Sequence, residues 1–418
     1  MDAEEEREKK RVILADDPSN RAMVQRDLHL LPREILVEIL SRLPITSLIH
    51  FKTTSHAGYD LIADPRLPPR FRNRVSDSNP YLILFGKDST AIQGLYFVDS
   101  EGCSRRVRKM DPPQHSEVSN LVGSCNGLLC VSYPTIPYPT FSASDATDGL
   151  LIYNPFVGDA VRVQPADNPF LALVEVFGFG FHPRTEEFKV VRIVSYQKFI
   201  MVADLALVGE FDEVFDTVNE AMVQVFTVGT TEWRNKGASP PELGDFVITP
   251  PQALVEGSLH WVGVVGTGGF SYIFAIISFE LADEVFEEIP HPPCQQLVSR
   301  GFSLSVLNGC LSAAGLVDTF DIWVMKQYRV KESWVKQFSF DPCFPGGWSS
   351  FLSRSPKVIC ALKNGEIILQ DNDSSLVSYD PVENRFKTLQ MSGLPEHFLA
   401  IPFLPSLFSA KASMNLQL

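Results

Sequence analysis

Paired cysteines and long apolar runs are both missing from this sequence. The seven cysteines among its 418 residues are odd in number and never stand in a Cys-x-x-Cys spacing, which disfavours a disulfide framework or a paired-cysteine zinc site. No apolar run approaches the roughly 18 residues that a membrane-spanning helix needs. The charged amino terminus is unlike a secretory signal. These absences predict a protein of a reducing compartment, cytoplasmic and/or nuclear, with no membrane partner.

Positive charge is scarce as well. The chain has 36 Lys and Arg residues against 50 Asp and Glu, a net charge of −14, which disfavours nucleic acid as the main partner. Apolar residues make up 45% of the chain, so it can supply the core of one large domain accompanied by a small one.

Patterns of catalytic and metal-binding residues are also absent. Ser124 does not stand at the centre of a Gly-x-Ser-x-Gly turn, and Gly178-Phe179-Gly180 lacks the third glycine of a phosphate-binding loop. The acidic turn at 371–373 lacks the remaining ligands of a calcium loop. Three histidines have no His or Cys at metal-ligand spacing: His182, His260 and His291. We therefore expect a protein that is not an enzyme and binds no cofactor.

The first feature that is present is a short amphipathic helix before Pro44. Pro32 suits the first helical position, and Pro44 ends the helix by pushing the residue before it out of the α region. At about 100° per residue, five apolar side chains share an arc of roughly 140°. These are Ile35, Leu36, Ile39, Leu40 and Leu43. A helical unit below about 40 residues seldom closes its own core, so this face must rest on the rest of the protein or on another protein.

Residues 31–67 resemble the F-box, the adaptor-docking motif of substrate receptors in SCF-type cullin–RING ubiquitin ligases. The run from Leu31 to Pro44 matches the opening of the family pattern almost throughout, and residues 47–52 and 55–65 are similar to its later parts. The resemblance implies a small three-helix domain that binds a Skp-type adaptor and, through it, cullin and RING subunits. The implied adaptor-binding residues are Leu31, Pro32, Ile35, Leu36, Ile39, Leu40, Leu43, Pro44, Leu48, Phe51, Leu61 and Ile62.

Three positions depart from the F-box pattern. His50 stands where arginine is usual, His56 where lysine is usual, and Gly58 where tryptophan is usual. Loss of a large aromatic anchor from an interface can cost a few kcal/mol. Adaptor binding weaker than in members with the tryptophan is one expectation, and a helical cap on the following domain is the alternative.

After residue 70 the pattern changes to short strands of β-branched and aromatic residues separated by turns. Four turns around glycine precede apolar strands, at Gly127, Gly257, Gly309 and Gly365, and the last three lie 52 and 56 residues apart. Asn-Gly between apolar runs indicates a type I′ hairpin, because both central residues need positive φ. Two hairpins per roughly 50 residues make one four-stranded blade. The sequence thus predicts a mainly β protein, a kelch-like β-propeller of about six blades, with five or seven left open.

Several phrases in this part resemble the F-box-associated domain of plant F-box proteins. They include Gly123-Ser124-Cys125-Asn126-Gly127-Leu128-Leu129-Cys130, Tyr153-Asn154-Pro155 and Ser258-Leu259-His260-Trp261. With the F-box, the resemblance covers about residues 31–390. We expect a disordered charged tail over 1–26, a helical F-box domain over 27–70 and a propeller domain over 75–410.

Loops between the predicted strands are the expected place for a target protein. Four long ones are predicted at 132–149, between Lys198 and Arg234, at 263–269 and at 341–356, and the second is acidic with no basic residue. Candidate target-binding residues are Tyr138, Asp212, Glu213, Phe344 and Trp348.

The hypothesis that follows is a non-catalytic substrate-recognition subunit of an SCF-type ubiquitin ligase, in which the propeller binds a target protein for ubiquitination. One alternative is a propeller-based interaction scaffold that no longer engages the ligase core. A propeller enzyme or sugar binder is another.

Overall fold

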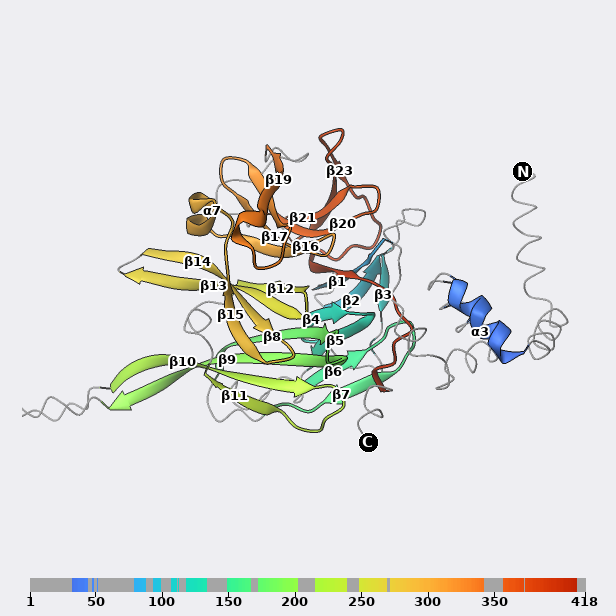
Figure 1. Ribbon diagram of the computed structural model, residues 1–418, viewed down its shortest axis with the longest axis horizontal. Coiled ribbons are helices and arrows are strands. Elements are labelled where there is room, and N and C mark those ends of the chain that lie inside the picture. Colours follow the sequence, from blue (N-terminus) through green and yellow to red (C-terminus); the bar gives the residue numbers. More distant parts are fainter. Residues whose placement is uncertain are drawn as a thin grey trace, which may run out of the picture. The chain divides into compact units, whose positions relative to one another are not determined.

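Antiparallel strands make up nearly all of the described secondary structure in this computed structural model (Figure 1). The structure describes residues 32–43, 47–48, 51, 79–87, 93–98, 107–110, 112, 118–133, 149–166, 172–201, 215–238, 248–268, 271–341, 356–371 and 373–411. The chain divides into two compact units. Unit 1 comprises residues 1–77 with Pro405–Phe408, and unit 2 comprises Ser78–Leu404 with Ser409–Leu418.

The described helix of unit 1 is α3 (Arg33–Arg42). It begins one residue later than expected: Pro32 is the N-cap, and its carbonyl accepts hydrogen bonds from the backbone N–H groups of Ile35 and Leu36. The helix ends as predicted, since Leu43 has an extended conformation with ψ of 147° before Pro44.

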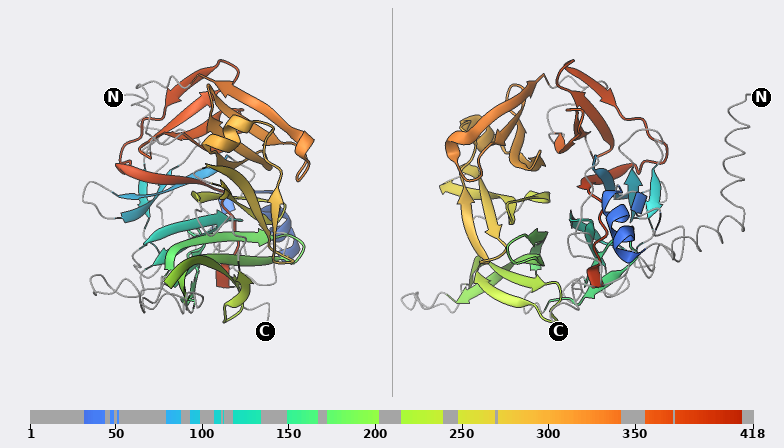
Figure 2. Two further views of the ribbon diagram at one scale, coloured as in Figure 1. Left: turned by 90° about the vertical axis from the view of Figure 1, so that its left-hand side faces the viewer. Right: turned by 45° about the vertical axis from the view of Figure 1, so that its right-hand side comes forward.

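Unit 2 is a propeller of six four-stranded blades, so the predicted blade number is confirmed (Figures 1 and 2). Blade 1 contains β24 (His397–Phe403), β1 (Tyr81–Lys87), β2 (Gln93–Val98) and β3 (Arg108–Met110). Blade 2 contains β4 (Asn120–Cys125), β5 (Leu128–Tyr133), β6 (Gly149–Tyr153) and β7 (Ala160–Val163). Blade 3 contains β8 (Ala172–His182), β9 (Glu187–Met201), β10 (Phe215–Thr227) and β11 (Arg234–Ala238).

The other three blades repeat the same order. Blade 4 contains β12 (Ile248–Val255), β13 (Ser258–Gly268), β14 (Ser271–Glu280) and β15 (Val285–Ile289). Blade 5 contains β16 (Ser303–Leu307), β17 (Cys310–Leu316), β18 (Phe320–Met325) and β19 (Trp334–Phe340). Blade 6 contains β20 (Lys357–Ala361), β21 (Ile367–Asp371), β22 (Ser375–Asp380) and β23 (Arg385–Thr388). Two short helices lie in connections, α7 (Gln295–Arg300) and η3 (Lys331–Ser333).

The last strand closes the ring. β24 pairs with β1 from Tyr81↔Phe403 to Lys87↔His397, so the innermost strand of blade 1 comes from the carboxyl-terminal part of the chain. The core lies between neighbouring blades, where apolar strand faces pack as separate clusters; one such cluster joins blades 5 and 6 through Phe320, Phe340 and Tyr379. The apolar and aromatic side chains buried in these clusters hold neighbouring blades together.

Positive φ angles confirm the predicted turns in three blades. Asn126-Gly127, Glu256-Gly257 and Asn308-Gly309 each have two residues with φ between 47° and 78°, as a type I′ turn requires. The turn at Asn364-Gly365 differs. It spans residues 362–366, Gly365 has φ of 90° while Asn364 is not in the positive region, and the Gly365 N–H donates to Leu362 O at 3.0 Å. β20 and β21 are therefore joined by a loop longer than a two-residue type I′ turn, and Gly365 is the last residue of the turn that begins at Leu362.

Antiparallel pairing gives the propeller two distinct faces. The tight turns between the first and second strands of the blades lie on one, which we call the turn face. The connections between second and third strands lie on the other, which we call the hairpin face. β1 begins and β24 ends at the turn face, because Tyr81 pairs with Phe403.

Two predicted loops are wrong in part. Residues 263–268 continue β13 and pair with β14 up to Gly268↔Ser271. Within the predicted acidic loop, β9 extends to Met201 and β10 begins at Phe215, with the pair Phe215↔Met201. Apolar residues next to the acidic ones supply β propensity, and backbone pairing overrides the loop-like composition.

Candidate functional site

The exposed face of α3 is the first candidate site. Ile35 and Ile39 are 49% and 46% exposed, one helical turn apart, whereas Leu36, Leu40 and Leu48 are buried. Pro32 is exposed, and Leu43 and Phe51 are half-buried. The predicted apolar arc is thus divided: one side packs in the protein, and the other presents two isoleucines to solvent. Leu31, Pro44, Leu61 and Ile62 lie outside the described residues.

A single ion pair flanks the isoleucines on the described part of this helix. Arg42 donates from Nε and Nη2 to Glu38 Oε1 at 3.0 and 2.6 Å, with both side chains exposed. Exposed pairs at this spacing contribute little to stability. The exposed isoleucines are therefore the feature of α3 that points to a partner.

The hairpin face of the propeller is the second candidate site. All five residues predicted to bind a target lie outside the described residues: Tyr138, Asp212, Glu213, Phe344 and Trp348. Their places in the chain are informative nonetheless. The strands on either side of them meet these segments at the hairpin face. β5, β9 and β19 end there at Tyr133, Met201 and Phe340, and β6, β10 and β20 begin there at Gly149, Phe215 and Lys357.

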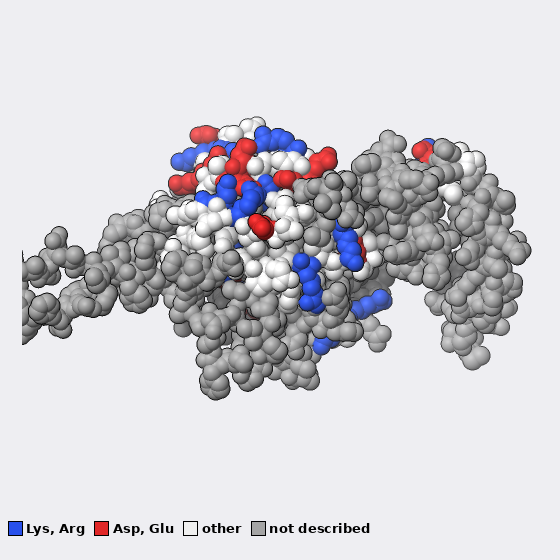
Figure 3. All heavy atoms as spheres, turned by 90° about the horizontal axis from the view of Figure 1, so that it is seen from below, with Lys and Arg blue, Asp and Glu red and all other residues white. Residues whose placement is uncertain are grey.

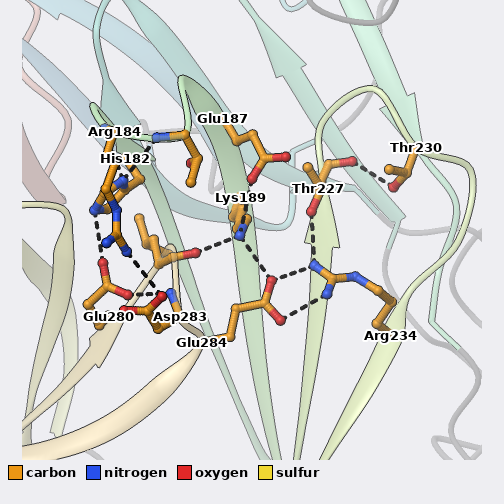
Figure 4. A network of polar contacts seen from close by, with 12 residues as sticks. His182, Arg184, Glu187, Lys189, Thr227, Thr230, Arg234, Glu280, Asp283 and Glu284 are labelled. Carbon is orange, nitrogen blue, oxygen red and sulfur yellow. Dashed lines mark hydrogen bonds and ion pairs between the residues drawn. The ribbon is translucent and has the colours of Figure 1, made fainter. Parts of the chain in front are cut away.

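A charged cluster joins blades 3 and 4 on the turn face (Figure 4). Glu284, in the turn after β14, accepts a hydrogen bond from Lys189 Nζ at 3.0 Å and a bidentate pair from Arg234. Lys236 Nζ lies 3.1 Å from Glu284 Oε2. The side chains of Lys189 and Glu284 are buried. Burial alone would raise the pKa of Glu284, but hydrogen bonds from Arg234, Lys189 and Lys236 outweigh it and lower the pKa from 4.5 to about 2.

His182 joins the same two blades beside this cluster (Figure 4). Its Nε2 lies 2.8 Å from Glu280 Oε1, and its Nδ1 accepts backbone N–H groups of Arg184 at 3.1 Å and Thr185 at 3.3 Å. Nδ1 is thus an acceptor and Nε2 carries the proton. The opposite charges in the cluster are paired with one another, so we interpret it as an inter-blade contact. Its members are far apart in sequence, and no local signal predicts them.

Residues that could suggest catalysis make structural contacts. Ser124 Oγ donates to Pro402 O at 2.6 Å, and burial raises the pKa of the neighbouring Cys125 thiol to about 12. His260 lies 2.9 Å from Tyr328 Oη through Nε2, and burial lowers its pKa to about 4. Among the described residues, no group of three His, Cys, Asp or Glu side chains could hold a metal ion.

Described Lys and Arg side chains lie beside Asp and Glu side chains on part of the face that Figure 3 shows. Five of the six outer strands expose basic residues, while β15 exposes acidic ones. The exposed residues are Arg108, Lys109, Arg162, Arg234, Lys236, Lys336, Arg385 and Lys387, against Glu287 and Glu288. The exposed charges of the outer strands are therefore mainly basic, although the chain as a whole has a net charge of −14.

Comparisons with known proteins identify the family. Residues 28–79 match the F-box domain, and residues 99–400 match the F-box associated beta propeller domain. The F-box protein At3g07870 of Arabidopsis thaliana is 33% identical over 397 residues, covering 89% of this chain and 90% of that protein. The F-box protein CPR1 of the same plant is 25% identical and covers 92% and 90%. The chain belongs to the F-box proteins with an F-box-associated β-propeller.

A solved structure to which this chain is similar is the periplasmic gluconolactonase PpgL of Pseudomonas aeruginosa. Its identity to this chain is 12% with a TM-score of 0.37, covering 74% of this chain and 82% of that protein. Separately, no helix among the described residues is long and apolar enough to cross a membrane.

Proposed function

We propose that this protein is the substrate-recognition subunit of an SCF-type cullin–RING ubiquitin ligase. The observation that carries the proposal is the exposed pair Ile35 and Ile39 on a helix that lies in an F-box domain. Two large aliphatic side chains one turn apart suit insertion into an apolar groove of a Skp-type adaptor. Cullin and RING subunits would follow through that adaptor.

The propeller is then the module that binds a target protein. The segments with the candidate target-binding residues join strands at the hairpin face. This topology supports target capture on the hairpin face. The protein itself supplies binding and orientation, and the transfer chemistry belongs to the RING and conjugating-enzyme partners.

A propeller scaffold that no longer engages the ligase is the second candidate. It is favoured by His50 and Gly58, which depart from the F-box pattern at positions where larger or charged side chains are usual. Co-purification of the full chain with an adaptor and cullin separates the two functions: retention supports the receptor, and no retention supports the scaffold. His50→Arg with Gly58→Trp should tighten adaptor binding under the receptor proposal.

A further inference from the structure

In blades 3 and 4 the hairpin formed by the second and third strands is longer than in the other four blades. β9 has 15 residues and β10 has 13, whereas the corresponding strands β5 and β6 of blade 2 have six and five. Both β9–β10 and β13–β14 project from the ring on the same side (Figure 1). The cluster around Glu284 ties the same two blades together at the turn face.

The outer part of the β9–β10 hairpin is two strands wide. β8 pairs with β9 only as far as Ala172↔Tyr196, and β11 pairs with β10 only as far as Ala238↔Met222. Beyond these pairs, β9 and β10 pair with each other to Met201↔Phe215. Among the described residues, no strand pairs with the outer edge of β10 over residues 215–221. A two-stranded ribbon is marginally stable alone in water, and a third strand would complete it.

The edge of β10 is a better place for an added strand than its neighbours. Seven residues are available on β10, against five on β9 over 197–201. The corresponding stretch of β13, 263–268, contains three glycines, which weaken strand pairing. The outer stretch of β14 has α7 beside it, and an added Cβ at Gly301 would meet the Phe274 ring.

The charged residues of β10 indicate what kind of strand would pair with it. Over residues 215–221 the strand carries Asp216 and Glu220, four positions apart, and no basic residue. Opposite charges on directly paired strands are favourable, and like charges are unfavourable. A strand with Lys or Arg at the same spacing would therefore be preferred over an acidic one.

We propose that a basic, extended segment of a target protein binds the propeller by adding a strand to the edge of β10 at residues 215–221, with which no described strand pairs. This deepens the receptor function proposed above and rests on it for the identity of the bound protein as a ubiquitination target. The segment would be about seven residues, or about 23 Å, long. Main-chain hydrogen bonds would provide affinity, and Asp216 and Glu220 would provide the preference for basic residues.

The test uses the full chain and a fluorescent peptide, Thr-Lys-Val-Thr-Val-Lys-Thr, whose binding is followed by anisotropy. A twin with Glu in place of Lys tests charge, and a twin with N-methyl groups on alternate backbone nitrogens tests strand pairing. The wild type should bind the Lys peptide at least tenfold more tightly than either twin. Asp216→Lys with Glu220→Lys should reverse the preference between the Lys and Glu peptides.

The matched control is Glu232→Lys with Glu288→Lys, the same change of charge at two exposed positions outside β10. It should bind as the wild type does, and both double variants should keep the wild-type melting temperature. Equal binding of the N-methylated peptide would overturn strand addition. Loss of the preference in the control as well would overturn the site, and absence of binding by all three peptides would overturn the proposal. Because no ligase component is present, these results are separate from the outcome of adaptor co-purification.

Discussion

The helix α3 and the propeller treat their large apolar side chains in opposite ways. Two of the ten residues of α3, Ile35 and Ile39, are about half exposed. In the propeller the aromatic side chains Phe279, Phe320 and Phe403 are fully buried, and the large apolar residues exposed among those described are valines and Leu404. The described propeller buries its large aromatic side chains in its own core, whereas the helix exposes two isoleucines of the kind that mark an interaction surface. This difference is the one we expect if α3 docks on an adaptor and the propeller binds a target, as proposed above.

Removing the closing strand should have the largest effect on the propeller. A chain that ends at residue 396 lacks β24, which supplies Phe398, Ile401 and Phe403 to the cores on both sides of blade 1. We expect loss of the cooperative thermal transition, because β24 is the inner strand of blade 1 and its pairing with β1 closes the ring. A chain that ends at residue 411 keeps β24 and should melt as the full chain does. A normal transition in the shorter chain would contradict the closure.

Glu284→Gln should have the next largest effect. The substitution leaves buried Lys189 without its main counter-charge, and loss of one partner of a buried pair costs about 3 kcal/mol. Asp283→Asn, in the same turn, removes an exposed partner of Arg184 and should cost less than about 1 kcal/mol. Urea unfolding measures both. Equal losses of unfolding free energy in the two variants would show that burial of Lys189 and Glu284 does not increase the contribution of their ion pair to stability.

The wild type and Glu284→Gln also test how the free energy of unfolding depends on pH. The pKa of Glu284 in the folded protein, about 2, lies below its ordinary value of 4.5. Its contribution is therefore present above about pH 4.5 and is lost as the pH falls toward 2. The stability difference between wild type and Glu284→Gln should shrink over that window. A difference that stays constant from pH 6 to pH 3 would contradict the assignment.

Two glycine substitutions should have smaller effects that differ from each other. Gly257 and Gly309 have nearly the same φ, 75° and 77°, so alanine is strained at both by about 1 kcal/mol. A Cβ at Gly309 meets nothing within 4 Å, whereas one at Gly257 would overlap the His182 ring. Gly257→Ala should therefore cost at least about 1 kcal/mol more in chemical unfolding. Equal costs would mean that the His182 ring moves aside freely.

Local signals predicted α3 and three of the four glycine turns. Pro44 ends the helix, and the φ angles at Asn126-Gly127 are intrinsic to those residue types, so neither needs tertiary information. The six blades followed from the repeat of these turns. Residues that depend on distant partners could not be predicted in the same way. Lys189 and Glu284 are 95 positions apart, and each looks like an ordinary surface charge in sequence.

Strand ends and the candidate site show the same limit. Asp216 and Glu220 suggested a loop, because acidic residues are depleted in strands, but pairing with β9 includes both of them. Along α3 the periodicity gave one apolar arc. Which side of that arc is buried depends on packing, so the sequence could not separate Ile35 and Ile39 from Leu36 and Leu40.

If the exposed side of α3 binds a Skp-type adaptor and the propeller folds independently of that contact, charges placed on this side should weaken adaptor binding and leave folding unchanged. Ile35→Asp with Ile39→Asp places two carboxylates where the adaptor interface would have to desolvate them, at a cost of several kcal/mol. Val382→Asp, at a 91% exposed position on the propeller, is the matched control. The measurement is the dissociation constant for the adaptor by calorimetry, with the melting temperature of each chain. We expect at least a hundredfold weaker binding for the double variant, wild-type binding for the control and an unchanged melting temperature for both. Wild-type adaptor affinity in the double variant would contradict this expectation.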